Sequence, residues 1–164
     1  MDPEKSRKKR KMIWTLIGIV VVVVALVTAY LGIFQKANQP LAKNEAKIGN
    51  AVFEVEIAAT MTEQARGLSF RPSLGENQGM LFLFGKPAAQ SFWMKDMNFP
   101  IDIIWIGGDA VLGFAQNAAP QPGVPLWGLT LYRSPDGTDK VLEVNAGTVA
   151  KDGIKVGDRV QIGI

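Results

Sequence analysis

The sequence predicts a mainly β domain of the α+β class, preceded by one transmembrane helix. The domain is expected to be a small antiparallel sheet or barrel-like fold with two short helices. Three observations support this prediction: one uncharged apolar stretch near the N-terminus, short alternating or apolar segments after it, and turn residues between those segments. The chain has 164 residues, so the part after Phe34 is long enough for one domain and too short for two.

The apolar stretch covers residues 13–34, reads IWTLIGIVVVVVALVTAYLGIF and contains no charged residue. As an α-helix it would span roughly 33 Å, which matches a hydrocarbon core of about 30 Å. Trp14 and Tyr30 stand near its two ends, where amphipathic rings prefer the membrane–water interface. We therefore predict a transmembrane helix over residues 13–34.

Charge on either side of this helix predicts its orientation. Residues 1–12 form a basic tail with six Lys or Arg residues and two acidic ones, whereas the other side has only scattered lysines. The positive-inside rule then predicts a single-pass cell-membrane protein with a cytoplasmic N-terminus and an extracytoplasmic C-terminal domain. A cleaved signal peptide is the alternative, because Val27-Thr28-Ala29 resembles a small-residue cleavage site. Both interpretations place the domain outside the cytoplasm.

Residues 35–47 are polar and weakly patterned, and they are predicted to form a stalk before a β-rich domain over residues 48–164. Strands are predicted where apolar residues alternate or cluster between turn residues. They cover residues 53–57, 79–84, 91–94, 101–106, 110–115, 141–144 and 159–162.

The connections also carry signals. Gly107-Gly108-Asp109 predicts a β-hairpin between two of the strands. Thr60 and Glu63 have the spacing of a capping box, which predicts a short helix ending near Gly67. A second helical turn is expected over residues 148–152, and the three prolines of residues 119–127 predict a loop that is either a lid or a simple connection.

Composition excludes several kinds of chemistry. The chain has no cysteine and no histidine, which excludes disulfides, thiolate metal sites, a cysteine nucleophile, a lipidated cysteine and the commonest general base. After residue 34 there are 12 basic and 13 acidic residues, so the domain has no basic bias of the kind that binds nucleic acid. The predicted partners are the lipid bilayer and an envelope glycan or protein, with no nucleic acid.

A series of short motifs runs through the domain. They are Thr62-Glu63-Gln64-Ala65-Arg66-Gly67-Leu68, Arg71, Gln78-Gly79-Met80-Leu81-Phe82, Phe92-Trp93-Met94-Lys95, Pro100-Ile101-Asp102-Ile103-Ile104, Leu142-Glu143-Val144, Ala146-Gly147 and Val156-Gly157-Asp158. In this order and spacing the chain resembles the DUF192 family, a domain of unknown function found widely in bacteria and archaea. The resemblance covers Ile48 to Ile164 and implies a compact β-rich domain, often exported or membrane-anchored, without supplying an activity.

The chain departs from that family at one motif. The family usually reads Trp-Met-Lys/Arg-Asn-Thr, whereas Asp96 and Met97 follow Lys95 here. If the Asn-Thr pair binds a ligand through neutral hydrogen bonds, Asp96 changes the charge of that site.

The candidate ligand-binding residues fall in two groups. Trp93, Lys95 and Asp96 combine an aromatic platform with a cation and a carboxylate, which suits a polar ligand such as a sugar. Arg66 and Arg71 could hold a carboxylate or phosphate. The alternative for the aromatic residues is core packing, and the alternative for each arginine is an ion pair with an internal acid such as Asp102 or Glu143.

Asp102 is the one candidate for catalysis, because it stands in an otherwise apolar strand. With Asp96 or Glu143 it could form a carboxylate pair for hydrolysis, and a salt bridge is the alternative role. Met61, Met80, Met94 and Met97 could offer thioether ligands to copper(I), but core filling explains them better. No metal and no cofactor are predicted.

The favoured function is an extracytoplasmic module that binds a ligand or a partner, with Arg66, Arg71, Trp93, Lys95, Asp96 and Asp102 around its site. A non-enzymatic role is preferred because the chain lacks histidine, cysteine and a recognisable nucleophile–base pair. The alternatives are a carboxylate-dependent hydrolase acting on an envelope substrate, and a structural or assembly protein of a membrane complex.

Overall fold

The computed structural model describes residues 3–37 and 41–163. The chain divides into two compact units, residues 1–40 and residues 41–164. The first contains one helix, α1 (Pro3–Ala37). Its segment Trp14–Gly32 has a mean hydropathy of 2.5 and exposed side chains. This length and composition suit a membrane span, and a signal sequence has the same properties.

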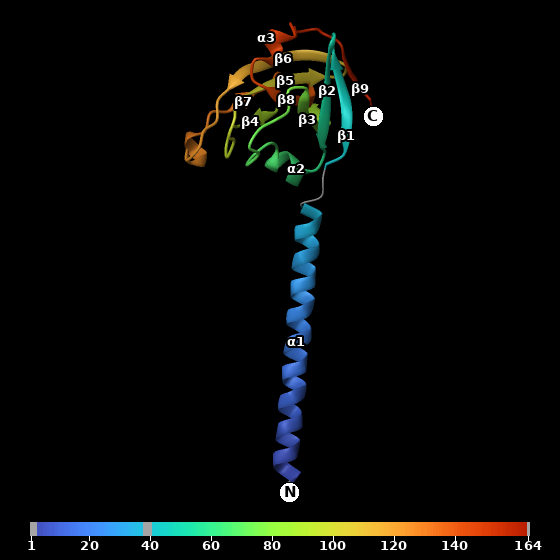
Figure 1. The fold of residues 1–164 in the computed structure, drawn as a ribbon, viewed down its shortest axis with the longest axis vertical. Coiled ribbons are helices and arrows are strands. Elements are labelled where there is room, and N and C mark those ends of the chain that lie inside the picture. Colours follow the sequence, from blue (N-terminus) through green and yellow to red (C-terminus); the bar gives the residue numbers. More distant parts are fainter. Residues whose placement is uncertain (1–2, 38–40, 164) are drawn as a thin grey trace. The chain divides into compact units, whose positions relative to one another are not determined.

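The second unit is built on a curled seven-stranded sheet that resembles half a barrel (Figure 1). Its strands are β1 (Lys43–Ile48), β2 (Ala51–Ala58), β3 (Gln78–Ala88), β5 (Ile101–Gly107), β6 (Ala110–Ala118), β8 (Thr138–Asn145) and β9 (Val160–Ile162), in the spatial order β6-β5-β8-β3-β2-β1-β9. A bridge between Ala110 and Arg159 joins the two edges of the sheet at one end. The mainly β fold class is therefore confirmed.

Pairing in this sheet is antiparallel except between β2 and β3, which run parallel. A chain returning to lie parallel needs a crossover connection, and here α2 (Met61–Arg66) lies within that connection. Two further strands, β4 (Ser91–Phe92) and β7 (Tyr132–Arg133), form a separate two-stranded sheet. The remaining helices are α3 (Thr148–Lys151) and the 3₁₀ turn η1 (Leu126–Gly128).

The central strands are buried on both faces over part of their length, which explains the nearly continuous apolar run in β5 and the apolar segment at residues 80–84 of β3. One core lies on the face that carries α3 and contains Phe53, Leu81, Ile104 and Leu142. The other lies on the opposite face and contains Met80, Phe82, Ile103 and Val141. Figure 1 shows α2 and α3 on opposite sides of the curled sheet.

The predicted capping box is confirmed at the start of α2. The Thr60 hydroxyl accepts a hydrogen bond from the Glu63 amide, and the Glu63 carboxylate accepts one from the Thr60 amide. These two bonds satisfy amides that would otherwise be unpaired at the helix start. The short helix is thereby held beside the sheet, where it forms one wall of the pocket described below.

The boundary of the domain differs from the prediction. Residues 43–47, for which the sequence predicts part of a polar stalk, form most of β1. Only Ala46 and Ile48 of this strand are buried, so its outward face is polar and gives the segment the composition of a linker. Residues 38–40 of the predicted stalk lie outside the described residues. The loop predicted over residues 119–127 is confirmed up to the start of η1.

Candidate functional site

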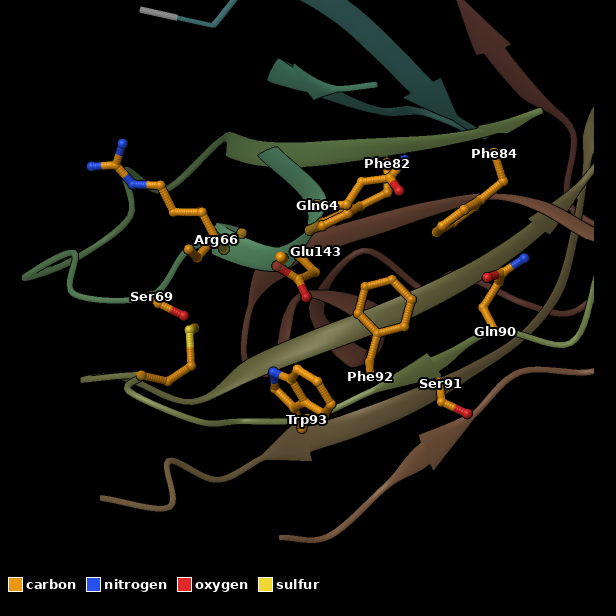
Figure 2. Close-up of a pocket in the computed structure, with 14 residues that line it drawn as sticks. Gln64, Arg66, Ser69, Phe82, Phe84, Gln90, Ser91, Phe92, Trp93 and Glu143 are labelled. Carbon is orange, nitrogen blue, oxygen red and sulfur yellow. The ribbon is translucent and has the colours of Figure 1, made fainter. Parts of the chain in front are cut away.

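The second unit contains a pocket with a volume of about 220 Å³, which is room for roughly seven water molecules. It lies between α2, the middle of β3, the β4 segment and the second half of β8 (Figure 2). The residues that line it are Gln64, Ala65, Arg66, Gly67, Leu68, Ser69, Phe82, Phe84, Gln90, Ser91, Phe92, Trp93, Met97 and Glu143. Glu143 is the one acid among these described residues.

Strand register explains how Glu143 reaches the pocket. Successive side chains of a strand point to opposite faces, so Glu143 shares the face of Val141 and stands opposite Met80 on β3 and Ile103 on β5. Figure 2 shows its carboxyl between α2 and the Phe92 and Trp93 rings. The strand β8, which lies between β5 and β3 in the sheet, therefore places this side chain in an apolar environment.

The Glu143 carboxyl is buried without a partner. Glu143 is 5% exposed, and its side chain makes no hydrogen bond or ion pair to the described residues. Every fully enclosed side-chain nitrogen or oxygen in the described structure has a hydrogen-bond partner. The two Glu143 carboxyl oxygens have none, so they are not fully enclosed and are accessible from the cavity. A carboxyl in this position has its hydrogen-bonding capacity available for a molecule that enters the pocket.

Burial has a large electrostatic consequence for this group. Removal from water raises the pKa of Glu143 to about 8, and the positive charge of Arg71 only partly opposes that effect. At neutral pH the side chain is therefore mostly a neutral carboxylic acid, which can donate one hydrogen bond as well as accept.

Aromatic rings form the walls around the carboxyl. Phe92 packs edge-to-face against Phe82, with centroids 5.1 Å apart, and against Phe84, with centroids 6.4 Å apart. Trp93 is 47% exposed and lies at the open side of the pocket. The cavity thus combines apolar ring surfaces with a single ionisable group at its base, which is the usual composition of a small-molecule site.

Two of the residues predicted to bind a ligand, Arg66 and Trp93, line this pocket. Figure 2 shows the guanidinium of Arg66 pointing away from the Glu143 carboxyl, so the pocket contacts mainly the aliphatic part of that side chain. The other predicted residues, Arg71, Lys95, Asp96 and Asp102, are not among those that line it.

Arg71 is engaged in a bidentate ion pair with Glu56. Its two terminal nitrogens lie 2.7 Å from the two carboxylate oxygens, and these bonds lower the pKa of Glu56. An internal acid was expected as the partner, but the structure selects Glu56 rather than Asp102 or Glu143. Glu56 on β2 and Glu143 on β8 both stand in register with Met80 on the strand between them. Arg71 therefore binds an acid that lies in the same cross-strand row as Glu143.

Lys95 and Asp96 form an ion pair with each other at a tight turn. Asp96 has φ +57, a region that aspartate and asparagine enter more readily than most residues. The Asp96 carbonyl accepts a hydrogen bond from the Phe70 amide, and the Lys95 carbonyl accepts one from the Ser69 hydroxyl. The pair therefore fixes the turn against the segment that follows α2.

Asp102 is fully buried on the other face of the sheet. Its two carboxylate oxygens accept hydrogen bonds from the Asn117 amide at 2.8 Å and the Val149 amide at 2.9 Å. Asp102 stands in register with Val144, whereas Glu143 stands in register with Ile103. Asp102 and Glu143 therefore point to opposite faces and do not form the carboxylate pair considered for hydrolysis.

From the sequence, Glu143 is expected only as an ion-pair partner for an arginine or as the second carboxylate of a pair with Asp102, and not as the centre of a pocket. The signal that could have identified it is a charged residue inside an apolar strand, Val141-Leu142-Glu143-Val144, which is the same signal that directed attention to Asp102. Which of the two acids faces a cavity depends on the elements covering each face of the sheet, and the sequence does not show this.

Known structures share this fold. A protein of unknown function from Novosphingobium aromaticivorans DSM 12444 is 39% identical, with a TM-score of 0.67 over 74% of this chain and 86% of that one. A protein of Sinorhizobium meliloti 1021, whose description suggests a transcription regulator, is 28% identical, with a TM-score of 0.69 over 76% of this chain and 97% of that one. No curated protein matches this chain.

The family comparison agrees with the motifs. The model of DUF192, described as an uncharacterized ACR, matches residues 43–162, which begins at the first residue of β1 and ends at the last residue of β9. The matched region therefore coincides with the whole seven-stranded sheet, and it includes every residue that lines the pocket. The chain belongs to the DUF192 family.

Proposed function

We propose that this chain is a membrane-anchored binding module whose β-rich unit holds a small ligand, or a small group of a larger one, in the pocket around Glu143. One observation carries the proposal: a buried carboxyl without a protein partner opens into a cavity walled by aromatic rings. An unpaired buried polar group costs stability, and a chain that keeps one beside a cavity gains nothing from it in folding. A ligand that uses the carboxyl gives it a role.

A panel of four compounds tests the pocket, with one compound for each chemistry: N-acetylglucosamine, phenol, choline and butyrate. We expect at least one to bind the full chain in detergent micelles by saturation-transfer NMR. Ala65→Trp should weaken that binding at least ten-fold, because Ala65 is an exposed α2 residue that lines the pocket, and an indole there would fill it.

Thr62→Trp is the matched control, since Thr62 is exposed on the same helix and does not line the pocket. Binding unchanged by Thr62→Trp and lost with Ala65→Trp locates the ligand. If no compound of the panel binds, and the purified chain carries no additional mass in native mass spectrometry, the pocket is not a small-ligand site.

The anchor is proposed from α1 and the charges before it. Residues 13–34 would cross the membrane, with the basic tail in the cytoplasm and the β-rich unit outside. Because the chain has no cysteine, single cysteines can report the orientation. With a membrane-impermeant maleimide we expect Asp136→Cys to be labelled in intact spheroplasts and Ser6→Cys only after permeabilisation.

The reverse labelling pattern would contradict the orientation. Release of the Asp136→Cys protein into the medium, shortened at its N-terminus, would show instead that the segment is a cleaved signal sequence. The two interpretations therefore give different results in one experiment.

The description of the Sinorhizobium meliloti protein as a transcription regulator is not extended to this chain. Residues 41–164 contain 13 acidic and 11 basic residues, so the unit carries no positive excess. Binding to nucleic acid depends on a basic surface that neutralises phosphates. The charge of this unit favours a ligand other than nucleic acid.

A further inference from the structure

Two polar side chains that line the pocket, Gln64 and Ser69, donate within the protein and leave the Glu143 carboxyl available for a ligand. The Gln64 amide nitrogen already donates to the backbone carbonyls of Ala58 and Leu83. The Ser69 hydroxyl donates to the carbonyl of Lys95. Both donors are used within the protein, and Arg71 is held by Glu56.

The walls of the pocket add a second preference. The face of an aromatic ring carries partial negative charge, so several rings around one cavity attract a cation and repel an anion. Phe82, Phe84, Phe92 and Trp93 supply such rings. The carboxylate form of Glu143 at the base of the pocket is also negative, so it adds to the attraction for a cation. The positive charge at the wall, on Arg66, is directed away from the carboxyl (Figure 2).

Building on the proposed ligand site, we propose that the pocket binds an organic ammonium group. The positive charge of the ligand would lie against the aromatic rings, and its polar groups would contact the Glu143 carboxylate. The small volume of the cavity, about 220 Å³, suits the charged end of a ligand rather than a large molecule. Rings that surround a quaternary or primary ammonium are a recognised solution to binding such ions.

Binding of a cation is coupled to loss of a proton. The charged group that acts on Glu143 is Arg71, which pairs with Glu56 two strands away. Arg66 also lines the pocket, but its guanidinium points away from the carboxyl, and the uncharged Met80 and Ile103 flank Glu143 on the adjacent strands. Burial keeps the pKa of Glu143 at about 8, so the free protein is mostly protonated at pH 7. An ammonium ion binds the ionised form, and roughly 0.9 proton should leave for each cation bound.

The test compares choline with 3,3-dimethylbutan-1-ol, its neutral isostere, by calorimetric titration of the full chain in detergent micelles. We expect choline to bind at least ten times more tightly than the alcohol. Titrations in two buffers of different ionisation enthalpy should show proton release at pH 7. The affinity for choline should rise up to about ten-fold for each pH unit between 6 and 8.

Glu143→Gln keeps the size of the side chain and removes its charge. In this variant choline should bind at least ten-fold more weakly at pH 8, without proton release and without dependence on pH, while the alcohol should still bind and its affinity should change much less than that for choline. The retained alcohol binding also shows that the pocket has kept its shape.

Equal or tighter binding of the alcohol, without proton release, would overturn the ammonium assignment and leave the pocket as a ligand site. If neither compound binds, the ammonium assignment also fails, and the N-acetylglucosamine, phenol and butyrate experiments with Ala65→Trp decide separately whether the site exists. The choline titration is repeated in nanodiscs of phosphatidylcholine and in nanodiscs of phosphatidylglycerol, to distinguish a lipid headgroup from a free ammonium compound as the ligand. If the pocket binds a lipid headgroup, phosphatidylcholine will compete with the added choline and weaken its apparent binding, whereas phosphatidylglycerol will not.

Discussion

Glu143→Gln should raise the free energy of unfolding at pH 8 by about 3 to 5 kcal/mol relative to the native chain, because it removes an ionisable group from a buried position in β8. The native carboxyl has a pKa of about 8, against 4.5 for the group in water. Between these two values the unfolded chain has lost the proton of Glu143 and the folded chain has kept it. Stability therefore falls as pH rises through this interval.

The same argument gives the shape of the whole profile. Below pH 4.5 the Glu143 carboxyl is neutral in both states, so the native chain and Glu143→Gln should unfold with similar free energies. Glu56 and Glu63 act in the opposite direction, because the hydrogen bond from Arg71 and those from Thr60 lower their pKa values. Their contribution is lost as the medium becomes acidic, and maximal stability of the native chain is expected near pH 5.

Urea unfolding at pH 5, 6, 7 and 8 measures this effect, followed by the intrinsic fluorescence of the four tryptophans, of which Trp105 is buried. Glu45→Gln is the matched control, since it removes the same charge from an exposed position on β1, and it should keep the native profile. Native and Glu143→Gln profiles that run parallel from pH 5 to pH 8 would show that the carboxyl is solvated, and they would remove the basis of the pocket proposals.

The sequence predicts most of the fold, because most of its signals are local. The alternation of Phe53, Glu54 and Val55 indicates a strand with one buried face, and the spacing of Thr60 and Glu63 identifies the start of a helix. Each signal requires only a few neighbouring residues. The parallel pairing of β2 with β3 is not local. It depends on the path of the connection that contains α2, and the residues of the two strands do not determine that path.

The site is harder to predict for the same reason. Trp93 and Arg66 were identified from their residue types, and the structure places both at the pocket. Glu143 and Asp102 look equivalent in sequence, since each is an acid within an apolar strand. Their difference arises from the covering elements: the face of Asp102 is closed by backbone amides of α3 and β6, and the face of Glu143 is left open beside α2.

Asp102→Ala should lower the free energy of unfolding by about 3 to 5 kcal/mol, because it leaves one buried and one partly buried amide without their acceptor. Those amides belong to Asn117, which has φ +54 in β6, and to Val149 in the first turn of α3. The N-cap residue of α3, Gly147, provides no side-chain cap. One carboxylate therefore fixes both an irregular strand and a short helix to β5.

Asp102→Asn should have an intermediate effect, since the amide keeps one acceptor and turns a donor toward the other N–H group. Asp136→Ala removes the same type of side chain from an exposed turn and should change the unfolding free energy by less than about 0.5 kcal/mol. Choline affinity measured on the folded fraction should be equal in all three variants and the native chain, because Asp102 lies on the face of the sheet opposite Glu143. A loss of ligand binding in folded Asp102→Asn would contradict this structural role and return Asp102 to the candidates for the functional site.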